Sequence, residues 1–121
     1  MTFGESDRAA LAAAQEIKIE TQSATGTVHE TIIWVAEHDG TIYVRSVNGP
    51  DARWYREAIS GRPAAIHVGG HRLPVTLEHA TDPTSIEGCS EGLRAKYRRS
   101  YSLRAMLAAD VLPTTLRAMP A

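Results

Sequence analysis

The sequence has a single cysteine, no excess of charge of either sign and no long hydrophobic run. With only Cys89, a chain of 121 residues can form no intrachain disulfide, which agrees with a reducing compartment. Its 13 basic and 14 acidic residues give a formal net charge of -1, so we expect neither a nucleic-acid nor a membrane-surface partner. The N-terminus carries acidic residues where a signal peptide has basic ones. We therefore expect a cytoplasmic protein.

The length and composition are those of one ordinary domain. Hydrophobic residues make up 43% of the chain and charged residues 22%, which is typical of a folded domain with its own core. The sequence contains no linker, repeat or low-complexity tract. We predict a single domain over residues 1–121.

Hydrophobic periodicity predicts a mainly β chain with helices. A helix capped by Ser6 or Asp7 is expected to about Gln15, and a second helix, capped by Asp51, is expected over 52–60. Six strands are predicted, at residues 16–21, 28–36, 41–47, 64–68, 71–80 and 114–119.

Two tight hairpins join these strands. Asp39-Gly40 and Gly69-Gly70 are dipeptides that tolerate positive φ, so each indicates a two-residue turn. Pro74 indicates that its strand lies at an edge or a bulge. A helical segment is expected from Asp82-Pro83 to about Asp110, interrupted at Gly88 and Gly92 and again near 100–102.

Six short strands expose fewer edges when the sheet closes on itself, so we expect a small barrel. Side chains fill a barrel of this size, and a planar ligand must then lie on the rim or between two barrels. This geometry predicts a homodimer whose interface includes part of the strands at 31–35 or 41–46.

The run "TIIWVAEHDGTIYVRSVNGPDARWYREAISGRPAAIHVGGHRLPV" resembles the flavin-binding split-barrel superfamily, which includes pyridoxamine-phosphate oxidase-like proteins and deazaflavin-dependent nitroreductases. The shared features are a strand that ends in a small polar residue, a glycine-containing turn, an aromatic pair on the next helix and an apolar strand that ends in Gly-Gly. Within the superfamily, the sequence is closest to an uncharacterised family of short bacterial proteins. The resemblance implies a six-stranded split β-barrel of the pyridoxamine-phosphate oxidase type, with an N-terminal helix and a C-terminal helical segment.

The resemblance also implies a set of cofactor-binding residues, which are Thr31, Ile33, Arg45, Ser46, Gly49, Trp54 and Tyr55. Arg45 and Ser46 end a strand where relatives hold the cofactor phosphate, and an arginine fork suits such a group. A structural role, in an ion pair or a loop, is the alternative for both residues. Because a strand-end arginine makes few core contacts, we expect Arg45→Ala to change the folded state little.

The cofactor that the resemblance implies is FMN or a deazaflavin coenzyme, and the implied function is a flavin- or deazaflavin-dependent oxidoreductase that acts on a small molecule. The alternatives are a ligand-binding barrel without turnover and a cofactor-free dimeric barrel. No residue is identified as catalytic, because the hydride chemistry would belong to the cofactor.

Other types of site have weak support in the sequence. His67 and His71 flank a hairpin turn, and a two-residue loop would pair Val68 with His71 and leave His67 opposite Arg72. The two imidazoles then do not converge, and no acid stands nearby at ligand spacing, so no metal site is predicted. Cys89 has no base beside it in the sequence, so we expect no nucleophilic role.

Overall fold

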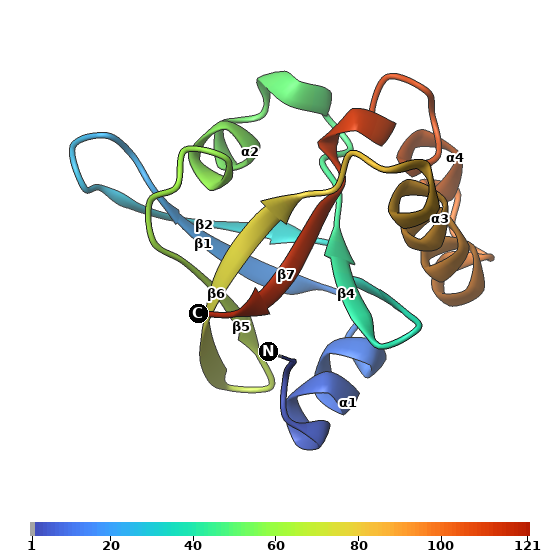
Figure 1. Cartoon of the computed structure of the whole chain (residues 1–121), viewed down its shortest axis with the longest axis horizontal. Helices are drawn as coiled ribbons and strands as arrows, with labels where there is room; N and C mark the ends of the chain where they lie inside the picture. The colour runs from blue at the N-terminus through green and yellow to red at the C-terminus, as the bar shows by residue number, and fades with distance from the viewer. Residues whose placement is uncertain (1) are drawn as a thin grey trace.

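The computed structural model describes residues 2–121, with four α-helices, two short 3₁₀ helices and seven strands (Figure 1). The helices are α1 (Glu5–Ala13), η1 (Gly49–Asp51), α2 (Arg53–Ala58), α3 (Pro83–Tyr97), α4 (Leu103–Met106) and η2 (Leu112–Thr114). The strands are β1 (Ile17–Gln22), β2 (Val28–Ile33), β3 (Ala36–His38), β4 (Thr41–Val44), β5 (Ala64–Val68), β6 (His71–His79) and β7 (Leu116–Pro120). None of the helices in this part of the chain is long and apolar enough to cross a membrane.

All seven strands form one curled antiparallel sheet in the order β2-β1-β5-β6-β7-β4-β3. The mainly β class with helices is confirmed, but the predicted count of six strands is wrong. The segment 28–36 is not one strand, because pairing with β1 ends at Ile33 and pairing with β4 starts at Ala36. The two edge strands of this half-barrel, β2 and β3, are therefore neighbours in sequence, joined by Trp34 and Val35.

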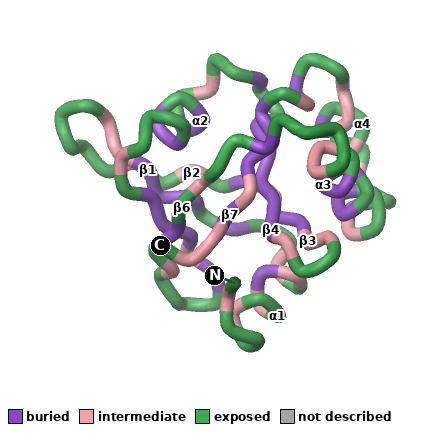
Figure 2. The backbone as a smooth tube through the Cα atoms, viewed as in Figure 1, coloured by how far each residue is buried: buried purple, intermediate pink, exposed green. Residues whose placement is uncertain are grey.

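Two groups of buried side chains form the core. The first lies inside the curl of the sheet and is completed by α1 and α2; it includes Leu11, Ile19, Val44, Ile66 and Leu116. The second lies between β3, β4 and the helices α3 and α4, and it consists of Ala36, Tyr43, Cys89, Leu93, Tyr97 and Met106. Figure 2 shows buried backbone along β1 and β4 and along part of α3, whereas β6 is largely exposed. The inner face of the sheet thus lies in the first core, and of its outer face only the part on β3 and β4 lies in the second.

The local sequence predicted the hairpin turn and the start of the third helix correctly, but it did not predict where the first two helices begin. The turn at Asp39-Gly40 has positive φ at both residues, at 50° and 81°, as a two-residue hairpin requires. Asp82 caps α3 by accepting a hydrogen bond from the Ser85 amide. The caps predicted for the first two helices are wrong, because α1 begins after Gly4 and α2 after Ala52, in both cases without a side-chain cap.

Of the two alternatives predicted for Pro74, an edge or a bulge, the edge is wrong, since β6 lies between β5 and β7. Pro74 pairs with Ala65 of β5, while the ladder between β6 and β7 begins one residue later, at Val75. Proline has no N–H, and at Pro74 none is needed, because the ladder with β7 has already ended there. The Pro74 carbonyl accepts a hydrogen bond from the amide of Ala121. A proline at the end of a ladder is tolerated even in an interior strand.

The two glycines of α3 do not interrupt the helix, contrary to the prediction. They allow α3 to approach β3. A Cβ on Gly92 would lie 2.8 Å from the carbonyl oxygen of Glu37, and a Cβ on Gly88 would lie 3.1 Å from the ring of His38. The helix propensity that glycine costs is offset here by close packing of a helix on a strand.

We expect Gly92→Ala to lower the free energy of unfolding by about 1–3 kcal/mol, the usual cost of overpacking a tight contact. The obstacle is a backbone oxygen, which cannot move without shifting β3. Thermal melting of Gly92→Ala beside Gly88→Ala isolates this contact, because both variants gain the same helix propensity and the half-exposed His38 ring can turn aside. Equal midpoints for the two variants would show that the helix and strand do not approach closely at Gly92.

Candidate functional site

A cavity of about 230 Å³ lies beside the break between β2 and β3. Its walls come from the end of β2, the loop after β4, α2 and α4. The lining residues are Glu16, Thr31, Ile32, Ile33, Trp34, Arg45, Val47, Asn48, Trp54, Ser102 and Met106. We call this the β2 cavity. Four of the seven residues predicted to bind a cofactor line it, namely Thr31, Ile33, Arg45 and Trp54.

Two indole side chains line the β2 cavity, and each is held by a second aromatic ring. Trp34 stacks on Tyr97 with ring centroids 3.8 Å apart and an angle of 5° between the planes. The Tyr97 hydroxyl donates to the carbonyl of Gln15 at 2.8 Å and accepts from the amide of Val35 at 3.4 Å. Trp54, which is 6% exposed, packs edge-on against Tyr55. These contacts hold aromatic surfaces at the cavity in fixed orientations.

The β2–β3 connection is held by a lysine as well. The Lys96 ammonium donates to the carbonyls of Val35 at 2.7 Å and Leu11 at 3.1 Å. Leu11 lies in the last turn of α1, where free carbonyls favour a cation. Burial lowers the pKa of Lys96 to about 8. Lys96 and Tyr97 together fasten the wall of the cavity to α3.

Thr31 carries the one buried side-chain polar atom in residues 2–121 that has no hydrogen-bond partner, its Oγ1. The residue lies on the inner face of β2, opposite Ile19 of β1, and it lines the β2 cavity. A buried hydroxyl without a partner costs free energy, about 1–3 kcal/mol in proteins. An unsatisfied group that faces a cavity suits a ligand that can exchange a hydrogen bond with it.

Arg45 lies at the inner end of the β2 cavity and is only 1% exposed. Its Nε donates to Thr115 Oγ1 at 2.9 Å, and its Nη1 donates to Ser90 Oγ and to the Met106 carbonyl, both at 3.0 Å. Its Nη2 donates to the Ile86 carbonyl at 3.0 Å. Burial lowers the pKa of the Arg45 guanidinium, and no carboxylate of the described residues is hydrogen-bonded to it.

The expectation that Arg45 makes few core contacts is therefore wrong. One side chain joins the end of β4 to α3, to α4 and to the start of β7. Four of the five guanidinium N–H groups serve protein acceptors, which leaves one on Nη2. The role of Arg45 as a phosphate ligand stays a prediction.

Three other predicted site residues do not line the β2 cavity. The Ser46 hydroxyl donates to the Gly49 carbonyl at 2.7 Å, and the Gly49 amide donates to the Ser46 carbonyl at 3.0 Å, so both residues close the loop after β4. Gly49 has a φ of 80°, which favours glycine. Tyr55 follows Trp54 on α2 and lies on another side of the helix, with its hydroxyl 3.2 Å from Nε2 of His79.

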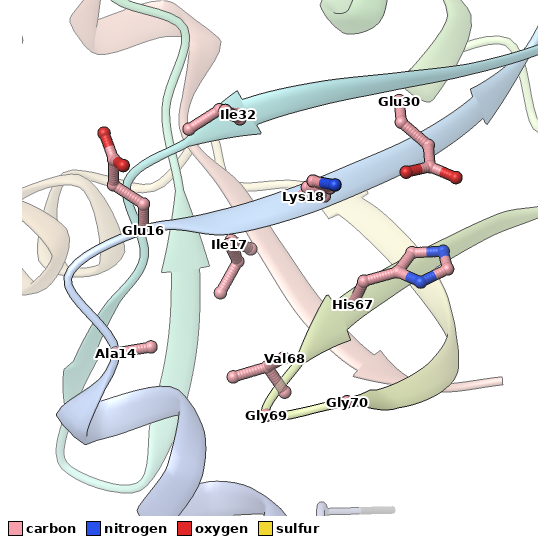
Figure 3. Close-up of a pocket in the computed structure, with 10 residues that line it drawn as sticks. All are labelled: Ala14, Glu16, Ile17, Lys18, Glu30, Ile32, His67, Val68, Gly69 and Gly70. Carbon is pink, nitrogen blue, oxygen red and sulfur yellow. The ribbon is translucent and has the colours of Figure 1, made fainter.

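A second cavity, of about 480 Å³, lies on the outer face of β2, β1 and β5 (Figure 3). It is lined by Ala14, Glu16, Ile17, Lys18, Glu30, Ile32, His67, Val68, Gly69 and Gly70. The predicted hairpin register is confirmed, because Val68 pairs with His71 and His67 with Arg72. The carboxylates close to His67 in space belong to β1 and β2 and not to residues near His67 in the sequence.

Cys89 is completely buried in the second core. Burial raises the pKa of its thiol to about 11, so the thiolate needed for nucleophilic attack is disfavoured at neutral pH. Cys89 is thus a packing residue of the second core.

The cavity residues that sequence reasoning missed come from segments distant in the chain. Ser102 and Met106 lie at the start and end of α4, a region that the sequence showed only as a break in a helix. The sequence predicts Trp34 within a continuous strand over 28–36, on the same face as Val28, Glu30 and Ile32. A tryptophan just before the hairpin strand was the available signal, but only the end of the β1–β2 pairing turns it toward the cavity.

Residues 7–118 match the model of a family described as "Uncharacterized protein conserved in bacteria (DUF2255)". The chain belongs to this family. The match spans nearly all of the described residues, including every residue of the β2 cavity. No curated protein matches the chain.

Solved structures show the same fold at low sequence identity. A proposed 5-nitroimidazole antibiotic resistance protein from Bacteroides thetaiotaomicron aligns with a TM-score of 0.67 and 14% identity, over 99% of this chain and 81% of that one. An FAD-binding protein from Mycobacterium smegmatis aligns with a TM-score of 0.60 and 15% identity, over 100% and 92%. The haem storage protein HutZ of Vibrio cholerae aligns with a TM-score of 0.64 and 10% identity, over 100% and 92%. This family member therefore has the fold of proteins that bind flavin or haem.

We expect Arg45→Met to lower the free energy of unfolding by about 3 kcal/mol or more, since it leaves two buried carbonyls and two hydroxyls without their donor. Arg45→Lys should recover only part of the loss, because one ammonium cannot reach all four acceptors, which lie on α3, on α4 and at the start of β7. Urea unfolding measures the effect, with the exposed Arg99→Met as the matched control. Equal midpoints for Arg45→Met and Arg99→Met would contradict the role of Arg45 as a structural link.

Proposed function

We propose that the protein binds the ring of a flavin or deazaflavin coenzyme in the β2 cavity. The observation that carries the proposal is the unpartnered Oγ1 of Thr31 in a cavity that two fixed indoles also line. An isoalloxazine ring offers flat faces for aromatic contact and polar edge atoms for hydrogen bonding, and these are the two features that the cavity complements. The similar structure that binds FAD supports the same ligand class.

The chemistry of the lining favours a flavin over haem. Haem iron is commonly held by histidine, cysteine or tyrosine, or by methionine together with histidine. Among the described residues that line the β2 cavity, Met106 is the one residue of these types, and no histidine accompanies it. The cavity is also smaller than the 300–1,000 Å³ or so of a typical ligand site, so it suits the ring of a cofactor better than a whole macrocycle.

The roles of the lining residues follow from their positions. Thr31 would bond an edge atom of the ring, and Trp54 and Ile33 would cover ring surface. The free N–H of Arg45 and the exposed Asn48 amide are the groups available to a phosphate. A bound flavin would supply hydride transfer to or from a small substrate, which makes the protein an oxidoreductase. Among residues 2–121, Glu16 and Arg45 are the titratable side chains that line the cavity, so protein residues chiefly bind and orient.

The alternative is a barrel that holds its ligand without turnover. The scarcity of proton donors in the cavity favours it. The two functions differ in one measurement: an enzyme reduces its bound flavin with a nicotinamide donor or reoxidises it with a small acceptor, at rates above those of free flavin. A carrier leaves these rates unchanged.

We expect Thr31→Val to weaken flavin binding about tenfold, the value of one hydrogen bond of about 1.4 kcal/mol. The same change should leave the thermal midpoint of the ligand-free protein equal or higher, because it removes an unsatisfied buried hydroxyl. Fluorescence titration with FMN, riboflavin and the deazaflavin coenzyme measures binding, and the exposed Thr76→Val on β6 is the control.

Absence of binding to all three ligands at tens of micromolar would overturn the flavin proposal and leave the cofactor-free barrel. The ratio of the FMN and riboflavin affinities tests the phosphate prediction separately. If Arg45→Lys reduces this ratio, the guanidinium contacts the phosphate. If both affinities fall together, Arg45 acts only through the fold.

We also propose a homodimer in which a second copy covers the β2 cavity. The cavity is small for a whole cofactor, and β2 is an edge strand whose outer face exposes Val28 by 52% and Ile32 by 60%. Apolar side chains on an edge strand favour association.

Sedimentation at micromolar concentration should therefore give a dimer, and Ile32→Glu should give a folded monomer. Replacement of the exposed Ile59 by Glu, on the far end of α2, should leave the dimer intact. A monomeric wild-type protein would contradict the shared site.

A further inference from the structure

A second group of polar side chains lies on the outer face of the sheet, apart from the β2 cavity. Glu30 of β2 and Glu20 of β1 are directly opposite each other in the antiparallel register. His67 of β5 lies on the other side of β1 and faces the same surface. Figure 3 shows the Glu30 carboxylate and the His67 ring directed toward one another across β1, at the rim of the outer cavity.

These three residues offer ligand atoms that all lie within 4.8 Å of one another. Tetrahedral ligands of a zinc-like ion at about 2.1 Å stand roughly 3.4 Å apart, so the most distant ligand atoms must draw together by up to about 1.4 Å. Glu30 is exposed and has a flexible side chain that can make this movement. Two carboxylates and one imidazole are a ligand set that zinc and similar transition metals accept.

The ion pairs and hydrogen bonds around Glu20, Glu30 and His67 show which of their polar atoms already have a partner. Arg72 binds Glu20 at 3.0 Å and 2.7 Å, and Nε2 of His67 lies 2.8 Å from the same carboxylate. The hydrogen bond from Arg72 is the main cause that lowers the pKa of Glu20 to about 2, so Glu20 is ionised. Among residues 2–121, Glu30 has no ion pair, although it lies opposite this second carboxylate.

Like charges placed opposite each other on two strands repel. Arg72 neutralises Glu20 but does not reach Glu30, and Lys18, which is opposite His67, forms no ion pair in the described chain. A cation between Glu30 and Glu20 would remove this repulsion. It would replace the hydrogen bond between His67 and Glu20, while Arg72 could keep the second Glu20 oxygen and hold that carboxylate in place.

We propose that Glu20, Glu30 and His67 form a binding site for a divalent transition-metal ion of the zinc type, with its remaining coordination position open to the outer cavity. The proposal departs from the sequence prediction of no metal site, which considered only residues near His67 in the chain. It does not rest on the flavin proposal, because none of the three ligands lines the β2 cavity, although Glu16 and Ile32 line both cavities.

The test is calorimetric titration of the full-length chain, free of any histidine tag and treated with a chelator, with Zn²⁺ alone. We expect one ion per chain with micromolar affinity and a thermal midpoint that rises with the Zn²⁺ concentration. His67→Gln and Glu30→Gln should each weaken binding at least tenfold. His71→Gln is the matched control, since His71 is an exposed imidazole four residues away that is paired with Val68.

Each result decides the proposal. A tenfold loss in both ligand variants with an unchanged control supports the site. An absence of binding at about 100 μM Zn²⁺ overturns the proposal, because a site with three protein ligands should bind zinc at that concentration or below. Binding that survives His67→Gln, or that His71→Gln weakens equally, also overturns it. Glu30 is exposed, so Glu30→Gln can be read without a change in folding.

Discussion

The buried guanidinium of Arg45 is the contact on which the arrangement of the helices depends. The curled sheet forms a core of its own, but α3 and α4 lie outside it and share a small second core with β3 and β4. Arg45 reaches from the end of β4 to both helices and to the start of β7. A buried cation must satisfy its donors, so it fixes the position of each acceptor. The four hydrogen bonds of Arg45 therefore also fix the wall that this side chain contributes to the β2 cavity.

The second constraint is covalent. The edge strands β2 and β3 stand at opposite ends of the sheet order and are joined by only Trp34 and Val35. This short connection limits how far the two edge strands can separate. Tyr97 and Lys96 hold it in place through hydrogen bonds to the backbone of Val35. The β2 cavity lies at this connection. A ligand there contacts a rigid wall and not a free edge, which suits pre-organised recognition of a flat ring.

The sequence predicted features that depend on neighbouring residues. The Asp39-Gly40 hairpin, the shared strand face of Thr31 and Ile33 and the helix that begins after Asp82 all follow from local geometry. The acceptors of Arg45 could not be predicted, because they lie 41 to 70 positions away in the chain. The strand break after Ile33 could not be predicted either, because it depends on which strand each side of the break pairs with. Gly88 and Gly92 illustrate the same limit: a glycine that breaks an isolated helix instead permits contact with a strand that the local sequence does not reveal.

Cys89 gives the molecule an internal reporter. Its thiol is one residue from Ser90, an acceptor of Arg45, and it has no exposed surface. A thiol reagent can reach it only when α3 separates from β3 and β4, so the rate of labelling measures how often this separation occurs. With no other cysteine in the chain, the signal has a single origin. The opening of the helical layer can thus be timed in the unmodified protein, separately from the melting of the sheet.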